Sequence, residues 1–435
     1  MKQAEYQISL FDGDHKLTID KPIRLIELFA GYGSQALALK YLGANFEHWK
    51  ICEWAVKSIQ AYKDLHFGDD NTDYSATKTQ DEVIDYLYSK GISANYNEPM
   101  TIEQIKRLGE EKQRVIYNNL IATHNLVSVC NCQASDLEIS DTDKYTYIMT
   151  YSYPCQDCSS AGKRLGMEKG SGTRSSLLWE VERILDECNG KLPQILLMEN
   201  VPEVIGTNNS EHFSQWVAKL DSLGYKSKWE ILNAKDYGVP QNRARCFMVS
   251  WLGNYYYDFP KKVKLEKRLK DILETNADNV KNFELSSKMK YYLTKGNDKY
   301  KVNQQSLIIN RDCACAKTTR EGCTRADSSD YICEELEDNY QCEINKNLQG
   351  YSIRKLTPKE CGRLMGVRDD DIDTMAVNQG NSSQYHLYGD SIVVDVLMAI
   401  FGQMLIAMHR RGGGGVNKKQ RNKITPIVEK PPFLG

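Results

Sequence analysis

The sequence has almost no net charge, and no apolar segment stands at its beginning. Its 435 residues carry a formal charge of -2 with a pI near 6.4, so any nucleic-acid surface has to be a local patch. Residues 1–21 are polar and mixed in charge, which predicts that no signal peptide is present. Thirteen cysteines without such a leader favour a reducing cytoplasmic setting over a disulfide scaffold.

Long apolar runs and regular cysteine spacing are also lacking. The longest apolar run, residues 391–408, contains Asp395 and Gln403 and therefore predicts a buried helix rather than a membrane span. The five cysteines between Cys313 and Cys342 include no C-x-x-C pair, which argues against zinc. We therefore expect no membrane segment and no metal. A chain of this length favours two or three domains.

The stretch from Tyr151 to Ser159 is the part of the chain that most strongly suggests chemistry. A largely apolar run, residues 145–150, predicts a buried strand, and Pro154 ends it because proline has no N–H for the ladder. Cys155 follows at the corner, before a loop rich in glycine. A cysteine in that position suggests a nucleophile, although a small buried thiol is the common alternative.

A glycine turn between a strand and a helix suggests a cofactor site. Residues 24–29 predict the strand and 34–42 the helix, and glycines at such a joint let the backbone approach a ligand. Glu53 lies 22 positions after Gly31, at the end of a second expected strand, residues 46–52. An acid there can accept both ribose hydroxyl hydrogens of an adenosine cofactor. A nicotinamide dinucleotide or a plain tight turn fits the same pattern.

Two further polar groups border expected strands. Residues 195–198 are wholly apolar, as in a parallel sheet covered on both faces, and they end at Glu199. A carboxylate there opens into the same crevice as Cys155, or it only caps the next element. Arg243 and Arg245 alternate before a strand, so as an extended segment they would share one face.

Of three other stretches, two suggest binding partners and one does not. Residues 7–11, from Gln7 to Phe11, resemble the short peptides that dock on the bacterial replicative sliding clamp, although a frayed leader or an edge strand fits them too. Residues 60–130 are polar, with helices expected at 79–90 and 101–123, and show no chemistry. Residues 259–301 contain twelve basic and six acidic residues, and this surplus of positive charge suits either a phosphate-binding surface or a solvated helix.

Together these pieces resemble the bacterial C5-cytosine DNA methyltransferases, in family order over nearly the whole chain. The matching pieces are Phe29-Ala30-Gly31-Tyr32-Gly33, Glu53-Trp54, Pro154-Cys155-Gln156, Glu199-Asn200-Val201, Gln241-x-Arg243-x-Arg245, the helix after Arg354 and the segment at Gly389. Residues 155–185 are also similar to the mollicute CpG-methylating enzymes. The sequence departs from the family at Asp390, where asparagine is usual.

The resemblance implies an α/β fold. It consists of a Rossmann-like, doubly wound, S-adenosylmethionine-dependent methyltransferase domain with a smaller target-recognition domain. We expect a leader at 1–21, the catalytic domain at 22–252, target recognition at 253–375, a part returning to the catalytic domain at 376–411 and a flexible tail at 412–435. The implied enzyme is a DNA (cytosine-5-)-methyltransferase, monomeric on double-stranded DNA, in a restriction–modification or orphan setting. A tRNA methyltransferase, a dinucleotide-dependent oxidoreductase and an inactive binding protein remain alternatives.

The resemblance also assigns roles by position. Cys155 would add to C6 of cytosine, Glu199 would hold N3 and the exocyclic amine, Arg245 would bind O2, and Arg243 would brace the site or a phosphate. The implied cofactor residues are Phe29, Gly31, Gly33, Glu53, Trp54, Asp136, Pro154 and Ser391. Asp136 could equally be a turn aspartate. The implied DNA contacts are Gln156, Ser159, Arg174 and Gln241.

Overall fold

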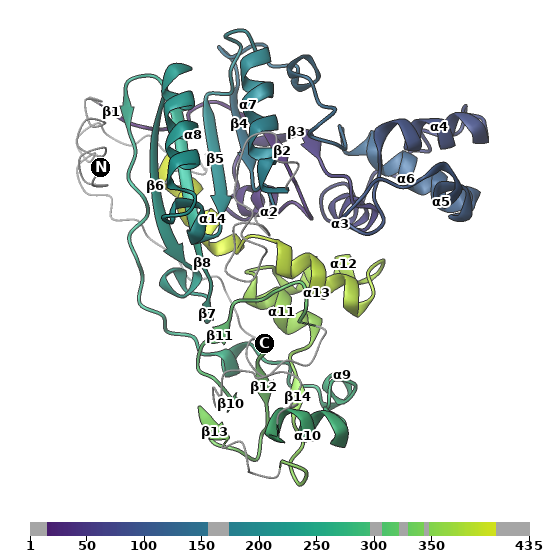
Figure 1. Cartoon of the computed structure of the whole chain (residues 1–435), viewed down its shortest axis with the longest axis vertical. Coiled ribbons are helices and arrows are strands. Elements are labelled where there is room, and N and C mark those ends of the chain that lie inside the picture. The colour runs from purple at the N-terminus through teal and green to yellow at the C-terminus, as the bar shows by residue number, and fades with distance from the viewer. Residues whose placement is uncertain (1–14, 155–173, 296–306, 322–328, 343–347, 406–435) are drawn as a thin grey trace, which may run out of the picture.

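The computed structural model describes residues 15–154, 174–295, 307–321, 329–342 and 348–405. In Figure 1 a larger α/β domain stands above a smaller one, and the helices α11 (Pro358–Leu364), α12 (Asp369–Ala376) and α13 (Asn381–Asp390) lie between them. Five short 3₁₀ helices connect other elements, namely η1 (Ala134–Leu137), η2 (Arg174–Leu177), η3 (Pro202–Ile205), η4 (Ala234–Tyr237) and η5 (Leu269–Ile272).

A six-stranded sheet forms the centre of the larger domain, in the order β3-β2-β4-β5-β8-β6. Its strands are β2 (Ile23–Leu28), β3 (Phe46–Cys52), β4 (Thr146–Tyr151), β5 (Ile195–Asn200), β6 (Tyr225–Asn233) and β8 (Ala244–Leu252). The neighbours among β3, β2, β4 and β5 pair in parallel, whereas β8 runs antiparallel to both β5 and β6. This arrangement confirms the predicted Rossmann-like class.

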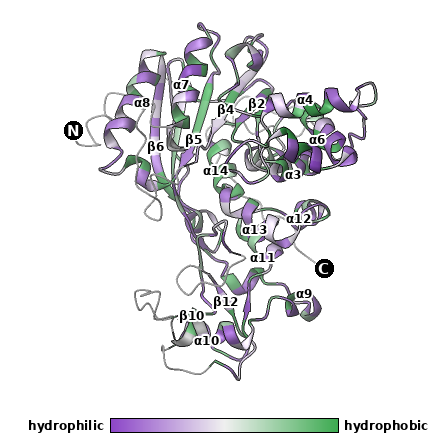
Figure 2. Ribbon diagram, turned by 45° about the vertical axis from the view of Figure 1, so that its right-hand side comes forward, coloured by the Kyte–Doolittle hydropathy of each residue, from purple (hydrophilic) through white to green (hydrophobic). Residues whose placement is uncertain are grey.

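Alternate residues of the central strands enter two different cores. Ile148 packs with α2 (Ser34–Tyr41) and α14 (Val394–Met404), whereas Met149 packs in a core with α7 (Leu178–Glu187) and α8 (Ser210–Ser222). Figure 1 shows one helix pair on each face of the sheet, and Figure 2 shows β4 and β5 in hydrophobic green between them. Side chains alternate along a strand, so a strand covered on both faces has to be apolar throughout.

The smaller domain is built on a four-stranded sheet with a core of its own. The order is β13-β10-β12-β14, with β10 (Leu307–Ile309), β12 (Tyr331–Ile332), β13 (Tyr340–Cys342) and β14 (Arg354–Lys355), beside α9 (Ala277–Lys281) and α10 (Ser287–Lys295). Two short parallel pairs join distant segments: β7 (Gln241–Asn242) with β11 (Ala314–Cys315), and β1 (His15–Lys16) with β9 (Tyr255–Tyr256).

Two helices from the stretch expected to belong to the smaller domain pack against the larger one. The helices α11 and α12 contribute Leu364 and Ile372 to the larger core rather than to the smaller one. A capping box starts α11, since Glu360 N donates to Thr357 Oγ1 (3.1 Å) and Thr357 N donates to Glu360 Oε2 (2.8 Å). Ile332 of β12 belongs to the larger core as well, so the boundary expected at residue 375 stays a prediction.

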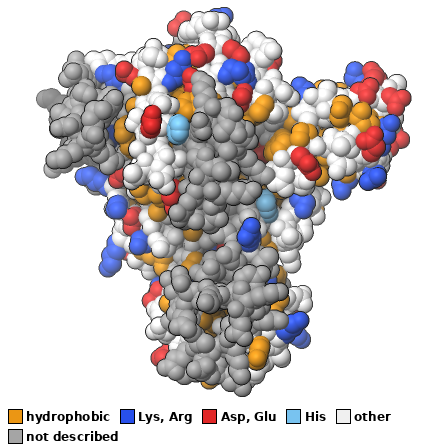
Figure 3. Space-filling model, in the orientation of Figure 1, with side chains coloured by type: hydrophobic (Ala, Val, Ile, Leu, Met, Phe, Trp, Pro, Cys, Tyr) orange, Lys and Arg blue, Asp and Glu red, His pale blue; other side chains and the backbone are white. Residues whose placement is uncertain are grey.

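Residues 56–122 form a helical arm at the side of the larger domain (Figure 1). Its helices are α3 (Val56–His66), α4 (Gln80–Lys90), α5 (Ile102–Arg107) and α6 (Glu110–Ala122). The single helix expected at 101–123 is broken at Gly109, whose φ of 82° is left-handed. Figure 3 shows acidic, basic and hydrophobic side chains interspersed on the visible face of the arm, so this face is not a patch of one charge.

Among the residues that the structure describes, one segment, Asn381–Met404, is long and apolar enough to span a membrane by length and composition. It comprises two helices, α13 and α14, separated by residues 391–393. Leu397 and Phe401 of α14 are fully buried in the larger core. This burial confirms the expected core helix.

Gly389, near the end of α13, lies tightly against the backbone of Thr318 and Thr319. A Cβ atom on Gly389 would lie 2.1 Å from both Thr318 C and Thr319 N. The close approach needs glycine, because a backbone cannot yield as a flexible side chain can.

We predict that Gly389→Ala lowers the free energy of unfolding by about 1–3 kcal/mol, through overpacking at this contact. Gly402→Ala in α14 is the matched control, since nothing lies within 4 Å of its added Cβ. Helix propensity alone should make that variant neutral, or more stable by up to about 1 kcal/mol. Urea denaturation measures both, and equal stabilities would contradict the tight contact.

Candidate active site

The carboxyl ends of four parallel strands line up at one edge of the sheet. The register pairs Leu28 with both Cys52 and Tyr151, and Tyr151 with Met198. The next residue on each strand therefore belongs to one row, which consists of Phe29, Glu53, Ser152 and Glu199. Open α/β sheets bind ligands at this edge.

The turn after β2 has three residues in the left-handed region. The φ angles are 61° at Phe29, 58° at Gly31 and 81° at Gly33. An added Cβ on Gly33 would lie 2.4 Å from His66 Nε2, whereas nothing lies within 4 Å of one on Gly31. Gly33 is thus needed for packing against α3, and Gly31 keeps the backbone open toward a ligand.

Glu53 fastens this turn to the end of β3. Its Oε2 accepts a hydrogen bond from Gly31 N (2.9 Å), and its Oε1 accepts one from Ala55 N (2.7 Å). Burial raises the pKa of the Glu53 carboxyl to about 7, although these N–H groups favour the charged form. The carboxyl can therefore be ionised or protonated near neutral pH.

A cavity opens beside the glycine turn. Its lining comprises Phe29, Ala30, Gly31, Ser34, Gln35, Ser58, Tyr96, Ser152, His386, Leu387, Asp390, Ser391 and Ile392. The predicted Phe29, Gly31 and Ser391 are among these residues. Tyr96 and His386 were not predicted, because each comes from a segment without a recognisable motif. Asp390 carried one signal, its departure from the family's usual asparagine.

Glu199 is a buried carboxyl with an arginine beside it. It is 8% exposed, and its Oε1 lies 3.2 Å from Arg245 Nε. Burial raises the pKa of Glu199, and the charges of Arg245 and Arg243 oppose that rise. Asn200 Nδ2 donates to Tyr153 O (3.2 Å), so the end of β5 is tied to the segment that leads into Pro154.

Arg243 does not share partners with Arg245. Its guanidinium is buried and donates to Lys317 O (2.6 Å), Gly389 O (3.1 Å) and Ser391 O (2.6 Å). Burial lowers the pKa of Arg243 to about 9. Arg243 thus joins the smaller domain to the end of α13, and its bonded, buried nitrogens are not placed to meet a phosphate.

Gln241 requires a correction. Its side chain is fully buried, and its Nε2 donates to Leu364 O (2.6 Å) while its Oε1 accepts from Lys317 N (2.9 Å). The amide is therefore used within the chain at the junction of the domains. In this structure it has no group to offer to DNA.

The remaining predicted site residues either lie outside the cavity lining or are not described by the structure. Asp136 is in η1, where its Oδ2 accepts from Gln133 N (2.9 Å), as a turn aspartate does. Trp54 is half-buried against the core of the helical arm, and Pro154 is half-buried after β4. Cys155, Gln156 and Ser159 lie outside the described residues, as does the side chain of Arg174. Within the described part of the chain, no cluster of three His, Cys, Asp or Glu could hold a metal.

Comparison with known proteins gives consistent matches. The family model for C-5 cytosine-specific DNA methylases matches residues 111–405. The chain is 33% identical over 387 residues to the Type II methyltransferase M2.ScrFI of Lactococcus lactis subsp. cremoris, covering 88% of this chain and 99% of that protein. It is also 33% identical over 397 residues to the orphan methyltransferase M.SssI of Spiroplasma monobiae, covering 88% and 97%.

A solved structure shows the same fold. The methyltransferase EhMeth of Entamoeba histolytica superposes with a TM-score of 0.60 at 15% identity, covering 88% of this chain and 98% of that one. These matches confirm the predicted family, fold class and activity, and they decide against the oxidoreductase. The chain belongs to the C-5 cytosine-specific DNA methyltransferases, enzymes that transfer a methyl group from S-adenosyl-L-methionine to cytosine in DNA.

Proposed function

We propose that this methyltransferase acts on a cytosine flipped out of a specific sequence in double-stranded DNA, through a covalent bond to Cys155. The observation that carries the proposal is the adjacency of β4 and β5. Their parallel pairing and the Asn200–Tyr153 hydrogen bond bring the segment ending at Pro154 next to Glu199. We further propose that the chain acts as a cytoplasmic monomer, in a restriction–modification or orphan setting.

Cys155 and Glu199 divide the chemistry on the ring. The Cys155 thiolate adds to C6, which makes C5 nucleophilic, and loss of the C5 proton later expels the thiolate. The raised pKa of Glu199 suits a group that gives a proton to N3 as negative charge develops on the ring. Arg245 is proposed to hold O2 of the base. Flipping the base costs on the order of a few kcal/mol.

The cavity beside the glycine turn fits S-adenosylmethionine by its donor set. When bound, this cofactor supplies an electrophilic methyl group on a sulfonium. The lining offers the Asp390 carboxylate, the Ser34 and Ser58 hydroxyls and the aromatic face of Phe29. These groups suit an ammonium, hydroxyls and a flat adenine ring. Glu53, which is bonded to the Gly31 turn, is proposed to accept the ribose hydroxyls.

The other positional assignments remain part of the proposal. Trp54, Pro154 and Ser391 would border the cofactor, and Gly33 would hold the turn beside it. Asp136 uses one oxygen for its turn, so only the other is proposed to reach the adenine amine. Gln156, Ser159 and Arg174 are proposed to contact DNA. The exposed Lys261 and Lys264 begin the basic stretch at 259–301 and are proposed to meet phosphates.

We expect Cys155→Ser to abolish turnover while the binding of S-adenosylmethionine survives, because only the nucleophile is lost. Cys130→Ser, at an exposed thiol that does not line the cavity, is the control and should keep full activity. DNA that contains 5-fluorocytosine at the target should trap a covalent complex with the parent chain and with Cys130→Ser. It should trap none with Cys155→Ser. An active Cys155→Ser, or a trapped complex linked elsewhere, would refute the mechanism.

Cofactor affinity should fall on acidification, because the Glu53 carboxyl has to be ionised to accept two hydroxyl hydrogens. With a pKa of about 7, its ionised fraction falls about ten-fold between about pH 8 and pH 6, and the association constant should follow. Calorimetry at several pH values measures this. Glu53→Gln should bind more weakly at pH 8 and lose most of the pH dependence. The same slope in that variant would assign the titration to another group.

We also propose that residues 7–11, which lie outside the described residues, bind a replicative sliding clamp. The support is their sequence, with a leading glutamine and a terminal Leu10-Phe11 as apolar anchors. Deleting residues 7–11 should weaken retention on immobilised clamp and leave methylation intact. Deleting residues 2–6 serves as the control for loss of length. If both deletions bind the clamp as the parent does, the proposal fails.

A further inference from the structure

The helical arm returns to the cofactor cavity through one short turn. After α4 the chain comes back beside β3, where Val56 N donates to Ser93 O (2.9 Å) and Ser93 N donates to Trp54 O (2.7 Å). Residues 93–98 then form a turn, here called the 93–98 turn. These hydrogen bonds anchor the turn to Trp54 and Val56, one and three residues beyond Glu53. A segment without any motif is thereby fixed beside Glu53, the carboxylate proposed to bind the cofactor.

Hydrogen bonds within the 93–98 turn hold Tyr96 at its tip. Asn95 Oδ1 accepts from Asn97 N (2.9 Å) and Glu98 N (3.2 Å), and Ser93 Oγ donates to Glu98 O (2.7 Å). Tyr96 has a φ of 62°, in the left-handed region that a tyrosine adopts only when its surroundings require it. Residues with such a strained backbone cluster at functional sites.

The side chain of Tyr96 forms part of the cavity wall. Its ring centroid lies 4.1 Å from that of His386 on α13, and its hydroxyl forms a 3.3 Å hydrogen bond with Ser58 Oγ. All three residues line the cavity with the glycine turn. His386 Nε2 lies 3.2 Å from Asp390 Oδ2, so an aromatic wall and a carboxylate adjoin.

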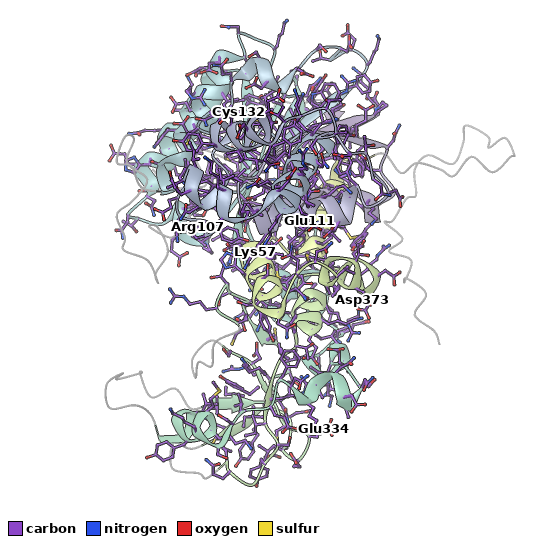
Figure 4. The ribbon with its side chains drawn as sticks, turned by 90° about the vertical axis from the view of Figure 1, so that its right-hand side faces the viewer. Lys57, Arg107, Glu111, Cys132, Glu334 and Asp373 are labelled. Carbon is purple, nitrogen blue, oxygen red and sulfur yellow. The ribbon has the colours of Figure 1, made fainter. Side chains whose placement is uncertain are left out.

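The two sides of this wall are fastened to each other by other contacts. Gln379 Nε2, just before α13, donates to Lys57 O (2.9 Å), and Asn378 Nδ2 donates to Asp64 Oδ2 (3.1 Å). Figure 4 labels Lys57 where the purple helices meet the yellow-green helices. Tyr96 and His386 are therefore held in contact by these hydrogen bonds between the segment before α13 and α3, as well as by the contact of their rings.

We propose that Tyr96 is a cofactor-binding residue, by which the helical arm completes the site for S-adenosylmethionine. An aromatic face next to carboxylates suits a ligand that carries a flat adenine ring and positive charge. Burial raises the pKa of the Tyr96 phenol, so the hydroxyl stays neutral and can donate a hydrogen bond. The inference rests on the cofactor cavity and is independent of Cys155.

Calorimetry with S-adenosylmethionine and the full chain, without DNA, tests this inference. We expect Tyr96→Ala to bind about five- to ten-fold more weakly, as loss of a ring contact predicts, and Tyr96→Phe to bind within about three-fold of the parent. Tyr88→Ala is the matched control, because Tyr88 lies on α4 of the same arm, is 50% exposed and does not line the cavity. In steady-state assays Tyr96→Ala should raise the cofactor KM and leave kcat nearly unchanged.

Several outcomes would overturn the inference. Binding by Tyr96→Ala within about two-fold of the parent would do so, since a ring contact contributes more than that. If Tyr96→Ala does not fold, as its thermal unfolding will show, Tyr96→Leu keeps apolar bulk at the tip and takes its place. Parent-like binding by Tyr96→Leu would then be decisive against a role for the ring. A parent chain that does not bind the cofactor would refute the cavity itself, and this inference with it.

Discussion

The alignment of four parallel strand ends is the constraint on which the site depends. Register alone brings Phe29, Glu53, Ser152 and Glu199 into one row, although they are spread over 171 positions of sequence, from 29 to 199. A slip by one residue on any strand would turn its side chains to the opposite face, and the two buried cores forbid that. The packing of Ile148 on one face and Met149 on the other therefore sets the strand register, and the register determines which side chains stand at the strand ends.

A second constraint is the buried charge that holds the smaller domain against this edge. Lys317 Nζ lies 2.6 Å from Asp330 Oδ2 and 3.3 Å from Glu321 Oε2, with all three side chains almost fully buried. Its backbone carbonyl accepts from Arg243, and its N–H donates to Gln241. Charges taken out of water are tolerated only when their hydrogen-bonding groups are satisfied, so this cluster favours one docking position of the two domains.

Local signals were readable from the sequence, whereas contacts between distant segments were not. The glycine turn at Gly31, the helix after Arg354 and the strand ending in Glu199 each depend on neighbours within a few residues. Tyr96 and His386 stand 290 positions apart, and no local pattern announces their contact. By position, Gln241 was expected to contact DNA and Arg243 to brace the site or a phosphate, but the partners of both side chains at the domain junction come from residues 317–391. Burial, which only the fold determines, decided their roles.

Two acids at the ends of parallel strands share one electrostatic influence, which is burial. Burial raises the pKa of both Glu53 and Glu199, but different groups oppose it. Backbone N–H groups of Gly31 and Ala55 favour the Glu53 carboxylate, which suits an acceptor of hydroxyl hydrogens. At Glu199 the positive charges of Arg245, 3.2 Å away, and of Arg243 oppose it, and Arg245 is the residue proposed to bind the base. Under the proposed mechanism, a base that engages Arg245 would weaken the opposing charge at Glu199 and favour the protonated carboxyl, which is the form that can donate a proton to the ring.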